Sequence, residues 1–248
     1  MKRFAIIGGT GSAALIAGRD TDRVKPAAGQ WGQPSSAILR WRTGDCEIHY
    51  LARHGSDGQI APHRVNYRAN VAALASLAPD GVIGINAVGG ITPAARPGGI
   101  VIPHQLIDYS WGREQTFCDG ADAPLRHIEF DPPFDTELRN GLISAAAAAG
   151  LVVLSKATYA CTQGPRLETA AEIDRLAADG CEVVGMTAMP EAALAREAGL
   201  AYAICAVVVN PAAGRLGIDQ TIHGEIAQHL ESGFAAAARL LERFFNAA

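Results

Sequence analysis

Short apolar segments alternate with segments of helical spacing along the whole chain, and this alternation constrains the fold more than any other feature. Runs rich in Val, Ile and Ala predict strands at residues 4–7, 37–41, 47–52, 82–85, 99–102, 151–154, 183–186 and 201–209. Apolar spacing predicts helices at residues 65–77, 134–149, 169–178, 191–198 and 220–245. Because strands that are apolar throughout are buried on both faces, the pattern predicts an α/β fold with a mixed, mostly parallel β-sheet flanked by helices.

No feature of the sequence divides the chain into several domains. It contains no low-complexity linker, no block of like charges and no internal repeat, so we expect residues 1–248 to form a single domain. The least regular stretch is 112–133, which carries several Asp, Gly and Pro residues. Such a long excursion is expected on the surface, where lids and contacts between subunits often lie.

Composition excludes several classes of function. Hydrophobic residues make up 49% of the chain, which is ample for a buried core, while the net charge of −4 opposes an electrostatic grip on nucleic acid. No segment approaches the roughly twenty apolar residues that span a bilayer, and the apolar run at the N-terminus is broken at once by Gly8 and Gly9. We therefore expect a cytoplasmic protein that acts on small molecules.

The five cysteines predict neither a disulfide framework nor a metal site. They are odd in number and scattered, and no two have the C-x-x-C spacing. The His, Asp and Cys residues show no ligand spacing either, so no metal site is predicted.

Polar residues and glycines gather where the predicted strands end. Five such clusters follow strands, at residues 8–12, 53–54, 86–90 and 186–187 and at Asn210. In α/β sheets, ligands bind at the carboxyl ends of the strands. These clusters are therefore the first indication of a binding site.

The glycine-rich turn at residues 8–12 allows three interpretations. Its backbone N–H groups can form an anion-binding nest, it matches a loose dinucleotide fingerprint, or it is a plain tight turn. A dinucleotide fold needs a second strand ending in an acid, whereas residues 20–30 are predicted to be loop. An NAD-linked oxidoreductase therefore remains an alternative with little support, and phosphate is favoured.

Residues after two further predicted strands could also bind phosphate. Arg53 follows a strand, and its guanidinium can fork onto phosphate oxygens; a surface arginine beside a loop-capping His54 is the other interpretation. Thr187 offers a hydroxyl after a strand, or else caps the following helix.

Several motifs, taken together in this order, resemble a known family. They are IGGTG (7–11), LARHG (51–55), VNYRAN (65–70), QGPR (163–166) and VGMTAMPE (184–191). The chain resembles the trimeric purine nucleoside phosphorylases, on their methylthioadenosine phosphorylase branch, over residues 4–245. Each motif is modest alone, and the combination is highly specific.

The resemblance implies a set of roles for individual residues. It implies phosphorolysis of a purine nucleoside with inorganic phosphate as co-substrate and no cofactor or metal. It also implies a homotrimer, in which His127 reaches into a neighbouring subunit's site. Arg53 and Asn210 are expected to act on the reacting groups. The implied phosphate contacts are Thr10, Arg53, His54, Ala87 and Thr187, and the implied nucleoside contacts are Met186, Glu168, Asn210, Pro211 and Ala212.

Two residues depart from the methylthioadenosine enzymes. Those enzymes carry Asp at the position of Asn210 and a small hydroxyl residue at that of Glu168. A carboxylate accepts from N1–H of a 6-oxopurine, and an amide NH₂ donates to O6 or N7. In adenine, N1 is an acceptor and the 6-amino group is a donor, so both would face a group of the wrong kind. The pair therefore predicts hypoxanthine or guanine as the base. A helix-start residue and a turn residue without such roles are the alternatives, as is a purine-binding protein without activity.

The sequence supports two different substituents at the 5′ position of the sugar. The overall likeness implies S-methyl-5′-thioinosine as the substrate. His223, however, falls where nucleoside-type relatives place a histidine against the 5′-hydroxyl, which favours inosine or guanosine. A helix-face residue without a role is the third interpretation of His223. We rank the methylthio substrate first.

Overall fold

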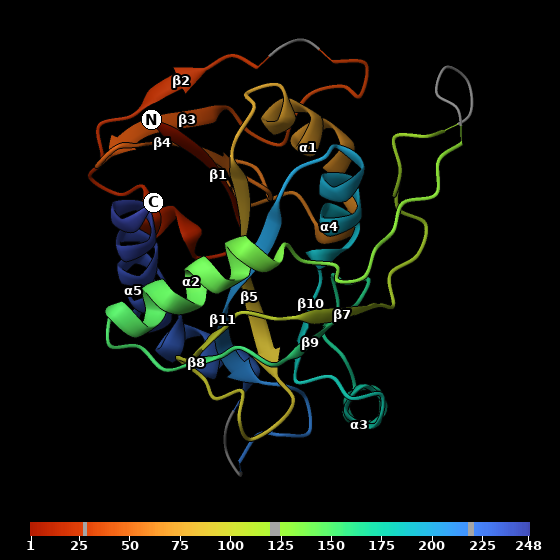
Figure 1. Ribbon diagram of the computed structural model, residues 1–248. Helices are drawn as coiled ribbons and strands as arrows, with labels where there is room; N and C mark the ends of the chain where they lie inside the picture. Colours follow the sequence, from red (N-terminus) through yellow and green to blue (C-terminus); the bar gives the residue numbers. More distant parts are fainter. Residues whose placement is uncertain (27–28, 120–124, 218–220) are drawn as a thin grey trace.

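The computed structural model describes residues 1–26, 29–119, 125–217 and 221–248 (Figure 1). Its strands are β1 (Lys2–Gly8), β2 (Asp22–Val24), β3 (Ile38–Thr43), β4 (Cys46–Ala52), β5 (Gly81–Gly90), β6 (Ile100–Val101), β7 (Gln105–Asp108), β8 (Val153–Leu154), β9 (Thr158–Cys161), β10 (Val183–Gly185) and β11 (Tyr202–Pro211). Its α-helices are α1 (Tyr67–Ala75), α2 (Thr136–Ala148), α3 (Ala170–Ala178), α4 (Ala188–Glu197) and α5 (Ile222–Ala247). Two short 3₁₀ helices lie at η1 (Ser12–Leu15) and η2 (Pro62–Arg64).

The strands form one mixed sheet. Its main path runs β2-β3-β4-β1-β5-β10-β9-β7, and β11 pairs with β5 and β6, which in turn pairs with β8. Six of the ten pairings are parallel, among them the central ones of β1 with β4 and β5 and of β5 with β11. The predicted fold class, a mostly parallel sheet flanked by helices, is confirmed.

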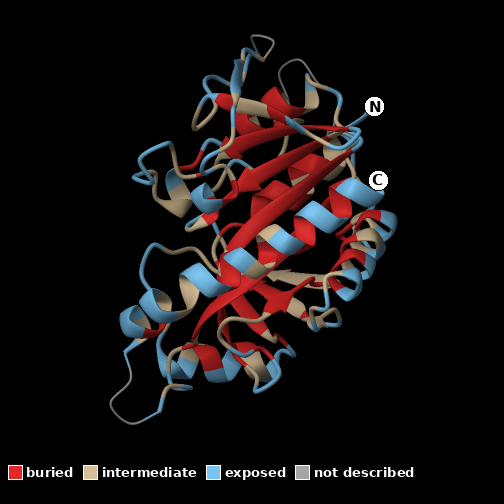
Figure 2. Cartoon of the chain, turned by 90° about the vertical axis from the view of Figure 1, so that its left-hand side faces the viewer, coloured by how far each residue is buried: buried red, intermediate tan, exposed pale blue. Residues whose placement is uncertain are grey.

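The core lies on both faces of the sheet because successive side chains of a strand point to opposite sides. In β1, Phe4 and Ile6 join a cluster with side chains of α2 and α5, whereas Ala5 and Ile7 join a cluster with α1 and α4. Figure 2 shows the resulting buried strands beneath helices that are buried on one side and exposed on the other. The buried central strands thus bring their carboxyl ends together at one edge.

Strand β5 is longer than predicted, since it continues past Ile85 to Gly90. Gly89 and Gly90 pair with β10 on one side and β11 on the other, and a side chain at Gly90 would collide with the carbonyl of Ala95. Asn86 and Ala87 therefore lie within a strand and not after its end. The end of β5 was missed because its glycines give no apolar pattern, although its backbone pairs with β10 and β11.

Three short strands were not predicted. The prediction of loop at residues 20–30 was wrong at β2, a three-residue edge strand paired antiparallel with β3. Strands β7 and β9 were missed because each has only four residues, too few to show a period, and both depend on pairing with each other. Because β2 lies at the edge of the sheet and is antiparallel, it does not supply the second strand of a dinucleotide-binding unit.

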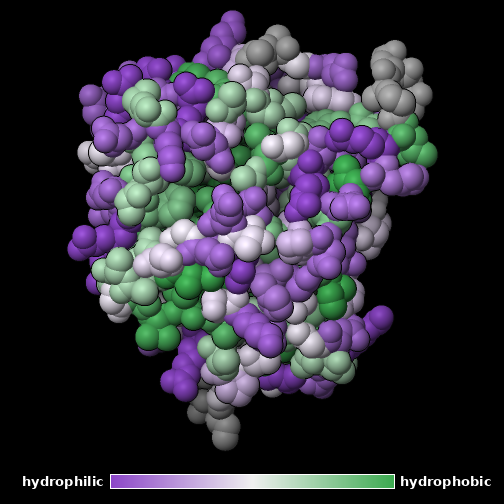
Figure 3. Space-filling model, viewed as in Figure 1, coloured by the Kyte–Doolittle hydropathy of each residue, from purple (hydrophilic) through white to green (hydrophobic). Residues whose placement is uncertain are grey.

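The irregular excursion has no helix or strand in its described parts, residues 112–119 and 125–133. It projects beside α4 at the right of Figure 1 and carries the exposed Leu125, with the exposed Trp111 just before it. In Figure 3, apolar side chains lie among polar ones over this side of the molecule. Among the described residues, no helix is both long and apolar enough to cross a membrane.

Candidate active site

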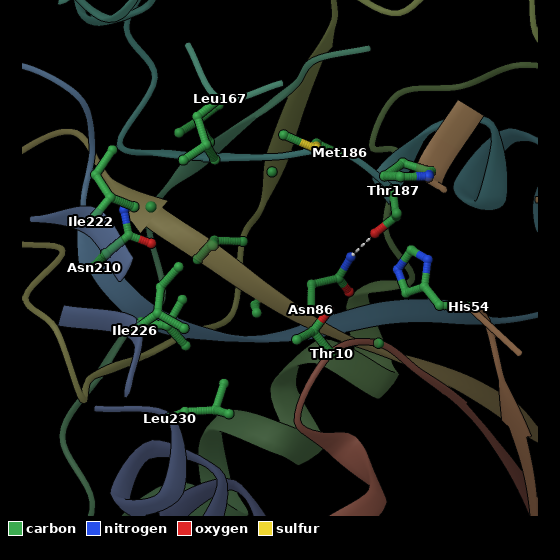
Figure 4. Close-up of a pocket in the computed structure, with 18 of the residues that line it drawn as sticks. Thr10, His54, Asn86, Leu167, Met186, Thr187, Asn210, Ile222, Ile226 and Leu230 are labelled. Atoms are coloured by element: carbon green, nitrogen blue, oxygen red, sulfur yellow. Dashed lines mark hydrogen bonds between the residues drawn. The ribbon is translucent and has the colours of Figure 1, made fainter. Parts of the chain in front are cut away.

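A cavity of about 320 Å³ lies where β1, β4 and β10 end and where β5 and β11 pass beside them. Figure 4 shows Thr10, His54, Asn86 and Thr187 on one side of it and Asn210, Ile222, Ile226 and Leu230 on the other. The predicted residues that line it are Thr10, Arg53, His54, Ala87, Glu168, Met186, Thr187, Asn210 and Ala212. Residues more than 200 positions apart in the sequence are thus brought to one site.

The glycine turn after β1 is fixed to the sheet. The N–H of Gly9 donates to the carbonyl of Ile85 and that of Ser12 to the carbonyl of Gly9, at 3.0 and 3.1 Å. A Cβ at Gly9 would come within 2.8 Å of Nη1 of Arg53, so only glycine permits this approach. Two N–H groups of the predicted nest are therefore already bonded to backbone carbonyls of the protein. Thr10 is the residue of the turn whose side chain can reach the cavity.

Arg53 is fully buried, and its fork does not face the cavity as predicted. Nε and Nη2 donate to the two carboxylate oxygens of Glu191, each at 2.7 Å. Nη1 donates to Ile85 and Nη2 to Ile7, both to backbone carbonyls. Burial alone would lower the pKa of Arg53, but the ion pair with Glu191 raises it. Four of the five N–H groups are thus used, and one on Nη1 is left for an anion.

His54 is held as a neutral imidazole. Burial, and then the charge of Arg53, lower its pKa below the usual 6.5. Nδ1 lies 2.7 Å from the carbonyl of Ile60, which can only accept, so Nδ1 carries the hydrogen. Nε2 is then an acceptor at neutral pH.

Thr187 stands at the first position before α4, but its side chain does not cap that helix. Its Oγ1 instead accepts a hydrogen bond of 2.7 Å from Nδ2 of Asn86, which is 2% exposed. The hydroxyl hydrogen of Thr187 is therefore free to donate to an anion. Asn86 also has a buried Oδ1 without a partner among the described residues. It belongs to one of the predicted strand-end clusters, but no individual role was predicted for it.

Glu168 and Asn210 line the same cavity. The carboxylate of Glu168 accepts a 2.6 Å hydrogen bond from the hydroxyl of Thr162. Asn210 donates from Nδ2 to the carbonyl of Pro211 at 2.7 Å, which leaves one amide hydrogen. A register shift in β11 between Val208 and Asn210 lets both Val209 and Asn210 line the cavity, although neighbours in a regular strand face opposite ways.

The far side of the cavity is an apolar stripe of α5. Ile222, Ile226 and Leu230 are spaced four apart, so they lie on one face of the helix, and all three line the cavity. The sequence reasoning missed this stripe, although its spacing was visible. His223 is exposed on α5 and is not brought into the cavity.

Two other predicted residues lie away from the cavity of their own chain. Pro211 ends β11 without lining it. His127 is exposed in the irregular excursion, at a place from which it faces solvent. Among the described residues, no group of three or more His, Cys, Asp or Glu side chains is arranged to hold a metal ion.

Known proteins resemble this chain over its full length. The family model described as the phosphorylase superfamily matches residues 3–246. A probable S-methyl-5′-thioinosine phosphorylase of Pseudomonas syringae is 45% identical over 100% of both chains. A 6-oxopurine nucleoside phosphorylase of Pyrococcus furiosus is 41% identical over 93% of this chain and 87% of its own.

Solved structures show the same fold. The methylthioadenosine phosphorylase of Schistosoma mansoni in complex with adenine superposes with a TM-score of 0.91 and 28% identity, covering 99% of this chain and 91% of its own. The enzyme from an antarctic soil metagenomic library, another methylthioadenosine phosphorylase, gives 0.87 at 30% identity, covering 98% and 85%. With its fold, its motifs and its cavity in agreement, the chain belongs to the phosphorylase superfamily.

Proposed function

We propose that this nucleoside phosphorylase cleaves 6-oxopurine nucleosides, with S-methyl-5′-thioinosine as its preferred substrate. The products are hypoxanthine and 5-methylthioribose 1-phosphate. One observation carries the proposal: a single cavity combines a side rich in hydrogen-bond donors, a carboxylate–amide pair and an apolar stripe. These three parts match a phosphate, a 6-oxopurine and a methylthio group.

The proposed reaction is a substitution at the sugar. A phosphate oxygen bonds to C1′ as the bond from C1′ to N9 breaks, and its electron pair passes to the purine. Thr10, Thr187 and the remaining N–H of Arg53 hold the anion beneath the sugar, so positioning lowers the barrier. The free amide hydrogen of Asn210 donates to N7 and stabilises the charge that grows there.

Base selection rests on Glu168 and Asn210. Thr162 already donates to one oxygen of Glu168, so the carboxylate is held as an acceptor for N1–H. With adenine, this acceptor would face the N1 lone pair, and a buried mismatch of this kind costs about 1–3 kcal/mol or more. The pair therefore supports hypoxanthine over adenine.

The apolar stripe supports the methylthio group at the 5′ position. Ile222, Ile226 and Leu230 offer a thioether apolar contact but offer a 5′-hydroxyl no partner. The exposed position of His223 removes the main argument for a 5′-hydroxyl. Inosine or guanosine remains the second candidate, because the Pyrococcus furiosus relative is named for 6-oxopurine nucleosides.

Assembly and location complete the proposal. We propose a homotrimer in which His127 enters a neighbouring subunit's site, since the excursion that carries it exposes Trp111 and Leu125. A cytoplasmic location and a single domain over residues 1–248 are proposed on the sequence pattern alone.

A side-by-side assay tests the function. Cleavage of methylthioinosine, inosine and methylthioadenosine is measured with and without phosphate. We expect phosphate-dependent release of hypoxanthine, fastest from methylthioinosine and slowest for the adenine compound. A preference for methylthioadenosine would refute the base assignment, and thermal stabilisation by NAD but not by phosphate would refute the reaction class.

A further inference from the structure

Arg113, in the irregular excursion, has every N–H group of its guanidinium engaged. Nε donates to the side-chain oxygen of Gln163 at 3.1 Å. Nη1 donates to the carbonyls of Met186 and Met189 at 2.8 and 2.6 Å. Nη2 donates to the carbonyls of Thr162 and Gln163 at 3.1 and 2.8 Å. Nη1 also lies 3.5 Å from the hydroxyl oxygen of Tyr67, so the five N–H groups meet six acceptors, four of which are backbone carbonyls.

These backbone acceptors follow two different strands, three of them in loops and the fourth, Met189, in the first turn of α4. Thr162 and Gln163 directly follow β9, and Met186 directly follows β10. Met186 lines the cavity, whereas Arg113 does not. Arg113 therefore lies outside the lining of the cavity and joins the loop of Met186, which lines it, to the loop that leads from Thr162 to Glu168, which also lines it.

The connection extends to the proposed base contact. The carbonyl of Thr162 accepts from Arg113, and the hydroxyl of the same residue donates to Glu168 at 2.6 Å. On the same loop as Thr162, Gly164 has φ +60°, and a Cβ there would collide with the sulfur of Met186 on the other loop. The two loops are thus in close contact, and their relative placement sets where Glu168 and Met186 stand.

We propose that Arg113 is a positioning residue for the nucleoside half of the site. It aligns the loop that bears Met186 with the loop that carries Glu168. Of the groups proposed for phosphate, Thr10 and Arg53 follow other strands, and Thr187, next to Met186, is held separately by Asn86. This inference rests on the proposed function for the identity of the nucleoside. A planar guanidinium is needed because its N–H groups diverge to both loops, whereas an ammonium is a point donor that reaches only one.

The test separates nucleoside from phosphate binding. Arg113→Ala and Arg113→Lys are assayed with each substrate varied at saturation of the other. Both variants should raise the nucleoside KM or lower nucleoside kcat/KM by roughly 10- to 100-fold, as misplaced contacts do. The phosphate KM should stay within about twofold. Added guanidinium ion, at concentrations that do not unfold the protein, should restore activity to Arg113→Ala but not to Arg113→Lys.

Arg139 provides the matched control. It is half-buried like Arg113 and donates to the carbonyls of Ile102, Pro103 and Ser155, none of which lines the cavity. Arg139→Ala should lower the melting temperature without changing either KM. Equal changes in both KM values for Arg113→Ala, or a lower melting temperature with unchanged KM values, would overturn the proposal.

Calorimetry of base binding tests the role of Arg113 independently of which nucleoside the enzyme cleaves. Hypoxanthine binding to the wild type and to Arg113→Lys is measured without turnover, and the variant should bind more weakly. If the wild type prefers another purine nucleoside, that base replaces hypoxanthine and the same comparison applies. Equal binding of the cleaved base by both proteins would refute the role of Arg113, whatever the substrate.

Discussion

At the scale of single residues, the pair of Arg53 and Glu191 changes how the phosphate site works. Both side chains are fully buried, and their charges largely cancel. At the proposed phosphate site, a phosphate dianion would therefore meet oriented neutral donors and one guanidinium N–H, and not an open positive charge. Tyr202 donates to Glu191 at 2.8 Å and completes the carboxylate's partners. Arg53 is thus as much a part of the core as of the site.

Arg53→Ala is expected to destabilise the protein as well as inactivate it. Removing one partner of a buried ion pair leaves the carboxylate of Glu191 uncompensated, at a cost of about 3–5 kcal/mol. The double variant Arg53→Met with Glu191→Met removes both charges and should regain much of that stability without regaining phosphorolysis. Urea unfolding and activity at limiting phosphate measure the two effects. A stable, active single variant would contradict both roles.

Asn210 and Glu168 are expected to act as a matched pair in choosing the base. Asn210→Asp should reduce activity on methylthioinosine, because a carboxylate repels the charge developing at N7. Adding Glu168→Ser should extend a shift toward methylthioadenosine, since the acceptor facing N1 is then gone. The measurement is kcat/KM for both substrates in the wild type, the single variants and the double variant. Equal losses on both substrates, with an unchanged ratio, would show that the residues only support the fold.

At the scale of elements, α5 is the helix that we propose to contact the 5′ end of the substrate. Its N-terminal half presents an apolar stripe to the cavity, and its C-terminal half packs Phe234, Leu241 and Phe244 into the core. One helix therefore packs on the sheet and lines the cavity. The long strands β5 and β11 likewise belong to both the core and the cavity, because these buried strands also carry Asn86 and Asn210, which line the cavity.

Ile226→Thr tests this assignment, because it keeps the branch at Cβ but shortens the side chain and adds a hydroxyl. The hydroxyl disfavours a thioether and can bond a 5′-hydroxyl, so the ratio of kcat/KM for methylthioinosine over inosine should fall about tenfold. His223→Ala is the companion variant, and with its exposed side chain it should leave that ratio unchanged. A larger effect from His223→Ala than from Ile226→Thr would instead support the nucleoside-type interpretation of His223.

At the scale of the whole molecule, the irregular excursion is the segment proposed to contact another subunit. The exposed His127 lies in an excursion without regular structure in its described parts, together with the exposed Leu125, and the exposed Trp111 directly precedes this excursion. An apolar, irregular surface segment of this kind is suited to burial between copies of the chain.

Subunit mixing is the sharpest test of a shared site. Light scattering should show a trimer, and His127→Ala should lower activity without changing the melting temperature. Co-refolding His127→Ala with Asn210→Ala should give more activity than either variant alone, since some interfaces then hold one intact set of residues. A fully active monomer, or no gain on mixing, would refute the shared site.

Much of the fold was predictable because local burial leaves a local pattern. The strands and helices of the central layer were predicted to within a few residues, since their apolar periods reflect the core on each face. Strands β2, β7 and β9 were not, because they are too short for a period and depend on their neighbours. The residues of the site were recognised from motifs, and nine of them do meet in one cavity.

The sequence by itself determined the alternation of elements, the family motifs and the donor–acceptor identity of Glu168 and Asn210. Only the tertiary structure decided that the fork of Arg53 turns to Glu191, 138 residues away, and that Asn86 holds Thr187, 101 residues away. It also decided that Ile222 and not His223 faces the cavity. The reason is physical: side-chain type and spacing report local burial, whereas hydrogen-bond partners depend on which distant strands lie side by side.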